Sequence, residues 1–264
     1  MPSKAPIPRT IDLSSEVAIV TGATAGLGLR FAKVLAAQGA SVAISGRRTD
    51  RLESLAEEIA EAGGTALAVP ADMSDMAQVE TIAATVEDRL GLPTLLVNNA
   101  GIADGQLATK MDVAFMERLI AINLTGPFLL AREVAKRLIK AKRPGRIVNI
   151  ASVAAYSYDG NGAALYSTSK AAIVRMTETL AVEWAKFHVN VNAIAPGIVK
   201  SEMTDGMAQR MKAGDTAEGF AVHTTRGRVP TPDFLDSTLL YLMDPASHAV
   251  TGTVIKIDDG QGTR

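Results

Sequence analysis

Short apolar segments alternate with longer amphipathic segments along almost the whole chain. The apolar segments are rich in Val, Ile, Leu and Ala, and they cover residues 16–21, 41–45, 65–69, 94–97, 146–151, 189–194 and 253–257. Short and nearly continuous apolar runs of this kind are typical of strands that are buried on both faces of a parallel sheet.

Between these runs, apolar residues recur at helical spacing, as in the stripe Leu52, Leu55 and Ile59. The spacing predicts helices that begin near Gly28 and over 51–62, 74–90, 112–140, 165–187 and 230–243. We expect Ser74 and Thr231 to be N-caps and Gly126-Pro127 to kink its helix. Alternating strands and helices predict an α/β fold, with a doubly wound parallel sheet of about seven strands and helices on both faces.

Length and charge narrow the possible classes of protein. The 264 residues fit one α/β domain, which we expect to span residues 16–264 after a flexible N-terminal arm over residues 1–15. The formal net charge of -1 gives no basic surface, so we expect neither nucleic acid nor a membrane as a partner. No apolar run reaches the ~20 residues of a membrane span, and the arm lacks the apolar core of a signal peptide.

The residue types that bind metals or form disulfides are scarce. The chain has no cysteine, which excludes disulfides, thiolate metal sites and a cysteine nucleophile and fits a cytoplasmic location. Its three histidines, His188, His223 and His248, lie too far apart to form a local metal motif. No metal site is therefore expected.

A glycine-rich turn follows the first predicted strand. Thr21-Gly22-Ala23-Thr24-Ala25-Gly26-Leu27-Gly28 leads directly into a helical pattern. Glycine lets the backbone approach a phosphate closely, and a helix start offers unpaired N–H groups and the positive end of its dipole. Strand, turn and helix in this order indicate a dinucleotide site, with a turn that binds no ligand as the simpler alternative.

The second predicted strand ends at Gly46 and is followed by Arg47 and Arg48. Near this position in dinucleotide folds, an acidic residue binds the ribose 2′-hydroxyl of NAD, whereas an arginine accommodates the 2′-phosphate of NADP. Asp50 is close, but its position is that of a residue starting the next helix. The pattern favours NADP(H), with NAD(H) as the alternative.

Polar residues stand at the ends of the later predicted strands. Asp72, Asn98-Asn99-Ala100-Gly101, Ser152 and Pro196-Gly197 each follow an apolar run. The carboxyl ends of parallel strands share one edge, where open α/β sheets bind ligands, so we expect these residues to meet there. Asp72 is expected to accept a hydrogen bond from an adenine amino group.

Tyr166 and Lys170 are four residues apart in a predicted helix and therefore lie on one face. The pKa of a free tyrosine is ~10, and a fixed ammonium beside the phenol is expected to lower it. Such a tyrosine exchanges a proton near neutral pH, and Ser152 is placed to hold the oxygen that the proton reaches. For an isolated pair of this spacing, a solvated helix face is the alternative.

The chain from about residue 16 to residue 260 resembles the short-chain dehydrogenase/reductase family, which has a Rossmann-type fold. The residues that carry the resemblance are Thr21 to Gly28, Asp72, Asn98-Asn99-Ala100-Gly101, Asn123, Ser152, Tyr166, Lys170 and Pro196-Gly197. The closest likeness is to the 3-oxoacyl-carrier-protein reductase-like branch, which includes many enzymes of ketones and secondary alcohols.

The resemblance implies an NAD(P)-dependent oxidoreductase in which Tyr166 is the general acid and base. Lys170 would lower the pKa of Tyr166 and bind the nicotinamide ribose, and Ser152 would hold the substrate oxygen. Asn123 would place a water that completes a proton relay, and the Ile198 backbone would contact the nicotinamide carboxamide. The implied cofactor-binding residues are Gly22, Thr24, Gly26, Leu27, Gly28, Arg47, Arg48, Asp72, Met73, Asn99, Ala100, Gly101, Tyr166, Lys170, Pro196, Gly197, Ile198 and Ser201.

Three departures from the family pattern stand out. Tyr166 follows Ser152 by fourteen positions, one more than this branch leads us to expect, so residues 156–165 are expected to bulge into the substrate entrance. Ser201 replaces the usual threonine but keeps a hydroxyl. Ala25 occupies a position where some NADP-preferring members carry a basic residue, which weakens the case for NADP(H) without reversing it.

Residues 197–228 lack a strand or helix rhythm, and we expect them to form a substrate lid. Met203, Met207 and Met211 recur every four residues and form either an apolar cover for a lipophilic substrate or a face packed on the core. His223 is expected to be a lid or surface residue. No arginine or lysine is placed for a substrate carboxylate, so we expect an uncharged or apolar ketone or alcohol.

Other functions compete with ketone reduction. An imine reductase would use the same geometry, and a nucleotide-sugar epimerase or dehydratase would need a larger carboxyl-terminal region than the one after Val189. A nucleotide-sensing protein without turnover would be expected to lack Tyr166 or Lys170, and both are present. The long helices over 112–140 and 165–187 are expected to pair between subunits, in a homotetramer or a dimer.

Overall fold

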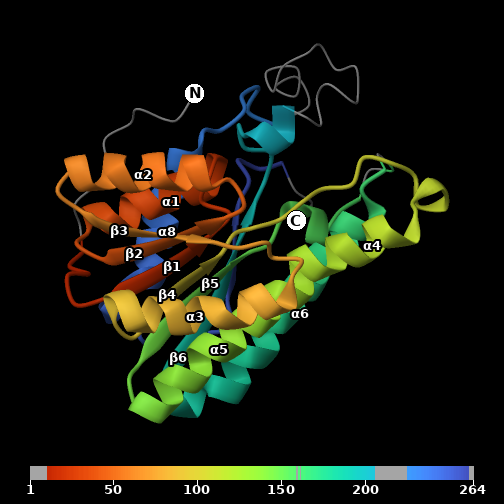
Figure 1. Ribbon diagram of the computed structural model, residues 1–264. Coiled ribbons are helices and arrows are strands. Elements are labelled where there is room, and N and C mark those ends of the chain that lie inside the picture. Colours follow the sequence, from red (N-terminus) through yellow and green to blue (C-terminus); the bar gives the residue numbers. More distant parts are fainter. Residues whose placement is uncertain (1–10, 159, 161, 206–224, 262–264) are drawn as a thin grey trace.

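The computed structural model describes residues 11–158, 160, 162–205 and 225–261. Within them, seven parallel strands form one sheet in the order β3-β2-β1-β4-β5-β6-β7 (Figure 1). The strands are β1 (Val17–Thr21), β2 (Ser41–Gly46), β3 (Thr65–Pro70), β4 (Leu95–Asn98), β5 (Gly145–Ile150), β6 (Val189–Pro196) and β7 (Val254–Ile257). The predicted doubly wound sheet is confirmed, and its strand order reverses between β1 and β4.

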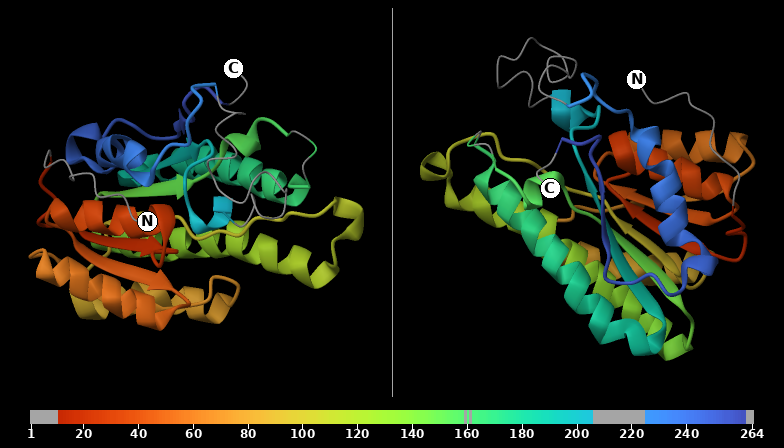
Figure 2. Two further views of the ribbon diagram at one scale, coloured as in Figure 1. Left: turned by 90° about the horizontal axis from the view of Figure 1, so that it is seen from above. Right: turned by 180° about the vertical axis from the view of Figure 1, so that it is seen from behind.

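Helices cover both faces of the sheet (Figures 1 and 2). One face carries α1 (Gly26–Ala37), α2 (Thr49–Glu61) and α8 (Asp236–Met243), and the other carries α3 (Met76–Leu90), α5 (Gly126–Ala141) and α6 (Ala164–Trp184). Each layer has its own apolar core. In β1, Ala18 and Val20 join the core under α1, whereas Ile19 joins the core under α3, because successive side chains of a strand point to opposite faces.

The helix predicted over 112–140 has an irregular middle. It consists of α4 (Val113–Ile120), a π-helical segment (Ala121–Thr125) and α5, so the irregularity begins before Gly126-Pro127. Pro127 lies in the first turn of α5. The π-helical segment contains Asn123, which is 1% exposed. Single π-helical turns within longer helices often occur at functional sites.

By length and composition alone, Val113–Ala141 is the one described helix that would be able to cross a membrane. Its α5 portion buries Leu130, Val134 and Leu138 completely in the core that it shares with α3. The core helices of globular proteins meet the same criterion of length and composition.

Two predicted helix caps are wrong. Asp75, and not Ser74, caps α3 by accepting hydrogen bonds from two N–H groups of its first turn, and Ser74 donates to Asp72 instead. An ionised carboxylate accepts stronger hydrogen bonds than a hydroxyl. Thr231 makes no side-chain cap bond; a 3-10 helix (Pro232–Leu235) follows it, and α8 begins only at Asp236.

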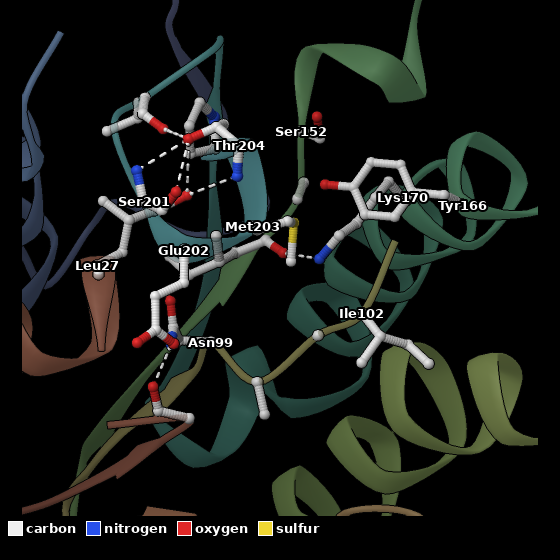
Figure 3. Close-up of a pocket in the computed structure, with 18 of the residues that line it drawn as sticks. Leu27, Asn99, Ile102, Ser152, Tyr166, Lys170, Ser201, Glu202, Met203 and Thr204 are labelled. Carbon is white, nitrogen blue, oxygen red and sulfur yellow. Dashed lines mark hydrogen bonds between the residues drawn. The ribbon is translucent and has the colours of Figure 1, made fainter. Parts of the chain in front are cut away.

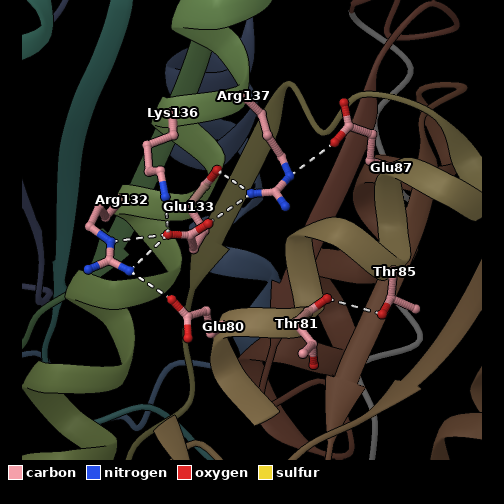
Figure 4. Close-up of polar contacts among 8 residues, drawn as sticks. All are labelled: Glu80, Thr81, Thr85, Glu87, Arg132, Glu133, Lys136 and Arg137. Atoms are coloured by element: carbon pink, nitrogen blue, oxygen red, sulfur yellow. Dashed lines mark hydrogen bonds and ion pairs between the residues drawn. The ribbon is translucent and has the colours of Figure 1, made fainter. Parts of the chain in front are cut away.

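A cluster of charges joins α5 to α3 (Figure 4). The Glu133 carboxylate is nearly buried and accepts hydrogen bonds from Arg132, Lys136 and Arg137. Arg132 also pairs with Glu80 of α3, and Arg137 with Glu87. Burial disfavours the charge, but the three cations hold the pKa of Glu133 below its ordinary value.

Candidate active site

The carboxyl ends of the strands surround one pocket of about 870 Å³. This volume lies within the range of small-molecule and cofactor sites. Every residue predicted for the site lines the pocket except Gly28 and Asn123. Residues that are distant in sequence are brought together because parallel strands end at the same edge.

The glycine turn is packed too closely for larger residues. Gly22 has φ +66°, and a Cβ there would lie 2.8 Å from Ala100 Cα; a Cβ on Gly28 would lie 2.3 Å from the Gly22 carbonyl oxygen. Asn99 fixes the same turn, since its Nδ2 donates to the carbonyl oxygens of Thr21 and Gly22 at 2.9 and 3.2 Å. Gly28 and Asn99 therefore both shape the turn, and Asn99 also lines the pocket.

The start of α1 fits an anionic group. Its N-cap residue, Ala25, makes no side-chain cap bond, and the first turn has no acidic residue. In contrast, Asp75 caps α3 and Asp112 caps α4. Gly26 and Leu27 of the first turn line the pocket, so a diphosphate bound there would meet N–H groups and the positive end of the helix dipole.

Ser152, Tyr166 and Lys170 converge at the other end of the pocket (Figure 3). Ser152 follows β5 and lies close to the Tyr166 hydroxyl, and its own hydroxyl accepts a hydrogen bond from the Ala154 N–H at 3.1 Å. Lys170 Nζ donates to the Ile150 carbonyl oxygen at 2.7 Å and lies 5.7 Å from the centroid of the Tyr166 ring. The predicted Tyr-Lys face therefore points into the pocket and not into solvent.

The predicted direction of the Tyr166 pKa shift is wrong for this structure. Burial raises the pKa of Tyr166; a hydrogen bond with Ser152 opposes the rise, and the charge of Asp104 adds to it. Burial also lowers the pKa of Lys170 to about 8. Spacing alone did not reveal that burial of the phenol decides the direction of this pKa shift.

Asn123 does not line the pocket, but it hydrogen-bonds the backbone of Ile102, which does. Its Nδ2 donates to the Ile102 carbonyl oxygen and to Ser169 Oγ, and its Oδ1 accepts from the Ile102 N–H. A Cβ on Gly101 would lie 3.5 Å from Asn123 Oδ1 and 3.6 Å from Lys170 Nζ. Asn123 thus fixes the strand-end loop that passes Lys170.

Arginines and Asp72 form the opposite end of the pocket. Arg48 donates to Thr24 Oγ1 of the glycine turn at 2.7 Å, and Arg47 lies 3.9 Å from Asp72. Asp72 Oδ1 accepts from the Ser74 hydroxyl and backbone N–H. The predicted position of these residues after β2 and β3 is therefore matched, and Met73 lines the same region.

The segment after β6 crosses the glycine turn. Pro196, Gly197, Ile198 and Ser201 all line the pocket, and a Cβ on Gly26 would lie 3.3 Å from Ser201 Cβ. The Ile198 N–H, expected to contact a carboxamide, donates to the side-chain amide oxygen of Gln261 at 2.6 Å. Gln261 therefore holds a donor that the resemblance assigns to the cofactor.

Asp104, Glu202 and Gln261 are among the lining or supporting residues that escaped prediction. Asp104 is 1% exposed, and its Oδ2 accepts from the backbone N–H groups of Leu165 and Tyr166 at 3.0 and 3.3 Å. It thereby caps the helix that carries Tyr166. Burial raises the pKa of Asp104 against these hydrogen bonds. No sequence signal links a loop aspartate to a helix sixty residues away.

Parts of three predictions lie outside the described residues. Ser157 and Tyr158, from the segment with the additional residue, line the pocket, but residues 159 and 161 are not described. Of the expected lid, residues 197–205 and 225–228 are described, and Met203 lines the pocket. Met207, Met211 and His223, like residues 1–10 of the arm, fall outside.

Comparison with known proteins identifies a matching family and several similar proteins. A family model for short chain dehydrogenase matches residues 16–212. A 3-oxoacyl-[acyl-carrier-protein] reductase of Synechocystis is 36% identical over 94% of this chain and 97% of its own length. A galactitol 2-dehydrogenase of Agrobacterium fabrum is 34% identical over 94% of this chain and 98% of its own length.

Among solved structures, a variant of actinorhodin polyketide ketoreductase with NADPH superimposes with a TM-score of 0.89. It is 32% identical, and the alignment covers 97% of this chain and all of that one. The family match, the relatives and the shared architecture together show that the chain belongs to the short-chain dehydrogenase/reductase family and is an NAD(P)-dependent oxidoreductase.

Proposed function

We propose that this enzyme reduces a ketone, or oxidises the matching secondary alcohol, with NADP(H) preferred to NAD(H) and Tyr166 as the general acid and base. The observation that carries the proposal is the convergence of Ser152, Tyr166 and Lys170 at one end of the pocket whose other end holds the glycine turn and two arginines. When bound, the nicotinamide supplies or accepts the hydride.

In the direction of reduction, Tyr166 donates its phenolic proton to the carbonyl oxygen, and the Ser152 hydroxyl holds that oxygen. The raised pKa of Tyr166 keeps the phenol protonated at neutral pH, so the proton to be donated is present. Lys170 then stabilises the phenolate that forms, because its ammonium lies beside the ring in a buried site. Asn123 supports this group by fixing the loop through Gly101 and Ile102.

The proposed substrate is uncharged or apolar. The described lining includes the apolar residues Ile102, Val153, Ala154, Ala163 and Met203, together with the uncharged polar residues Ser157, Tyr158 and Ser167. Apart from Lys170, the charged residues among the described lining are Arg47, Arg48, Asp72 and Glu202, at the end that we assign to the adenosine. Within the described lining, a substrate carboxylate would thus find no cationic partner beyond Lys170 at the end of the pocket that holds Tyr166.

The decisive experiment measures NADPH and NADH oxidation with simple ketones, diketones, 3-oxoacyl thioesters and cyclic imines. Reduction of at least one ketone class, faster with NADPH, is the expected result. Turnover of imines alone would replace the ketone assignment. Tight cofactor binding without turnover of any compound would instead favour a nucleotide sensor.

We also propose that the enzyme is a homotetramer. Phe128 on α5 and Val182 on α6 are 45% and 81% exposed, so each helix presents an apolar side chain to solvent. Pairing of these helices between copies would cover both side chains. Light scattering at micromolar concentration that shows only monomer would contradict the proposal.

A further inference from the structure

Two arginines at the end of the pocket face a carboxylate of the same chain. Glu202 pairs with Arg48 at 3.0 Å and with Arg51 at 2.5 Å. Glu202 lies beyond β6, more than 150 positions from either arginine. The contact therefore joins two segments that only the fold brings together.

This carboxylate lies where the cofactor's adenosine end is expected. Arg48 follows β2, the position at which dinucleotide folds recognise the ribose 2′ substituent, and it also donates to Thr24 of the glycine turn. Ser201, the neighbour of Glu202, packs against Gly26. The segment Val199–Asp205 therefore crosses the glycine turn, and its Glu202 side chain reaches the two arginines.

We propose that Glu202 is an internal counter-anion that competes with the 2′-phosphate of NADP(H) for Arg48 and Arg51. Glu202 would thereby weaken the enzyme's preference for NADP(H) over NAD(H). This inference rests on the proposed function, in which these arginines meet the adenosine end of the cofactor.

The chemistry of the groups supports direct competition. A guanidinium offers the same fork of donors to a carboxylate and to a phosphate. Arg48 and Arg51 hold the pKa of Glu202 below its ordinary value, so the carboxylate is charged at neutral pH. A phosphate monoester carries about −1.5 to −2 charges, so it outcompetes a single carboxylate for the same arginines.

Exposure makes the exchange feasible. The side chains of Arg48, Arg51 and Glu202 are 40%, 47% and 54% exposed, and ion pairs in such surroundings are weak. The 2′-hydroxyl of NAD(H) carries no charge, so it leaves the Glu202 pairs intact. Glu202 therefore lowers the affinity for the phosphorylated cofactor selectively.

Two further carboxylates, Asp72 and Asp50, lie near these arginines. Asp72 lies 3.9 Å from Arg47 and 3.6 Å from Arg118, so its ion pairs involve neither Arg48 nor Arg51. Asp50, on the first turn of α2, adds a second negative charge near Arg51. Removing the Glu202 charge thus frees Arg48 while Arg47 keeps its own carboxylate.

Equilibrium binding tests the proposal without requiring a substrate. Titration calorimetry would measure NADP⁺, NAD⁺, adenosine 2′,5′-bisphosphate and adenosine 5′-monophosphate against the wild type and Glu202→Gln. We expect the two 2′-phosphates to bind about two- to thirty-fold more tightly to the variant. NAD⁺ and adenosine 5′-monophosphate should change less than two-fold. Glu58→Gln is the matched control, since Glu58 pairs with Lys33 on the surface outside the pocket.

Each other outcome overturns the inference. Weaker binding of the 2′-phosphates would mean that Glu202 orients the arginines for the cofactor. Equal changes for all four ligands would mean that it acts on the shared part of the site, and no change would mean that it does not compete. If the wild type bound neither NADP⁺ nor NAD⁺, the proposed function would fail first, which separates the two failures.

Discussion

The two ends of the pocket handle charge in opposite ways. At the Tyr166 end, Lys170 is 5% exposed, and burial alone moves its pKa from 10.5 to about 8. At the arginine end, Arg47 and Glu202 have more than half of their side chains exposed, and several ion pairs share the surface. The same Coulomb law acts at both ends, but water screens only the second.

The difference teaches where single substitutions matter. At the buried end, no neighbouring side chain among the described residues can take over the role of Tyr166 or Lys170, so the loss of either group changes the chemistry. In the exposed end, each pair contributes roughly 0–1 kcal/mol, so selectivity results from several weak contacts and can be adjusted gradually. The following predictions are ordered from the largest expected effect to the smallest.

Tyr166→Phe should have the largest effect. Loss of the phenolic proton donor is expected to lower kcat for ketone reduction by about 10²–10⁴-fold while leaving cofactor affinity within two-fold. Steady-state kinetics and cofactor titration measure the two quantities. Reduction at a rate near that of the wild type would show that another group donates the proton.

Lys170→Met should lower turnover by less than Tyr166→Phe does, yet stabilise the fold near neutral pH. The burial that lowers the Lys170 pKa from 10.5 to about 8 costs about 3 kcal/mol, and losing the hydrogen bond to Ile150 offsets about 1 kcal/mol of that gain. We therefore expect the variant to be more stable by about 2 kcal/mol at pH 7.

The extra stability of Lys170→Met should decrease as the pH rises. Between pH 8 and pH 10.5 the folded wild type loses the lysine proton while the unfolded chain keeps it, so wild-type stability rises with pH. The advantage of Lys170→Met should be full below pH 8 and shrink towards pH 10.5. Urea unfolding at pH 7 and pH 10 measures it, and an advantage that grew with pH would contradict the burial argument.

Arg48→Ala should reduce, but not abolish, the preference for NADPH. We expect the ratio of kcat/KM for NADPH to that for NADH to fall about three- to tenfold, with a smaller change for Arg47→Ala. Arg48 is positioned by Thr24, whereas Arg47 is the more exposed side chain. Arg175→Ala, which breaks a surface pair with Glu178 on α6, is the control. If this ratio were unchanged in both variants, neither arginine would contribute to the choice between NADPH and NADH.

Asp104→Asn should have the smallest effect on the rate of reduction, but it should shift the pH dependence of that rate. The amide keeps an acceptor for the Leu165 and Tyr166 N–H groups but removes a charge that raises the pKa of Tyr166. The alkaline limb of the reduction profile should therefore move to lower pH. Asp112→Asn, at the exposed cap of α4, should leave the profile in place. A uniform loss of rate without a shift would indicate a purely structural cap.

Much of the fold could be predicted from local patterns. The seven short apolar runs became the strands because a strand buried on both faces needs continuous apolar sequence. Gly22, Asp72, Asn99 and Ser152 met at one edge because each follows a parallel strand. Helix starts were less predictable, since Asp75 and Ser74 are both good N-caps and only their neighbours decide between them.

Local patterns in the sequence were thus sufficient to predict the sheet, the glycine turn and the strand-end residues of the pocket, because periodicity and strand ends are local properties. Tertiary structure alone decided the direction of the Tyr166 pKa shift, since burial depends on every segment that packs around the phenol. It also decided that Asp104 caps α6 and that Glu202 holds Arg48 and Arg51. Such contacts join side chains far apart in the chain, and no spacing along the sequence encodes them.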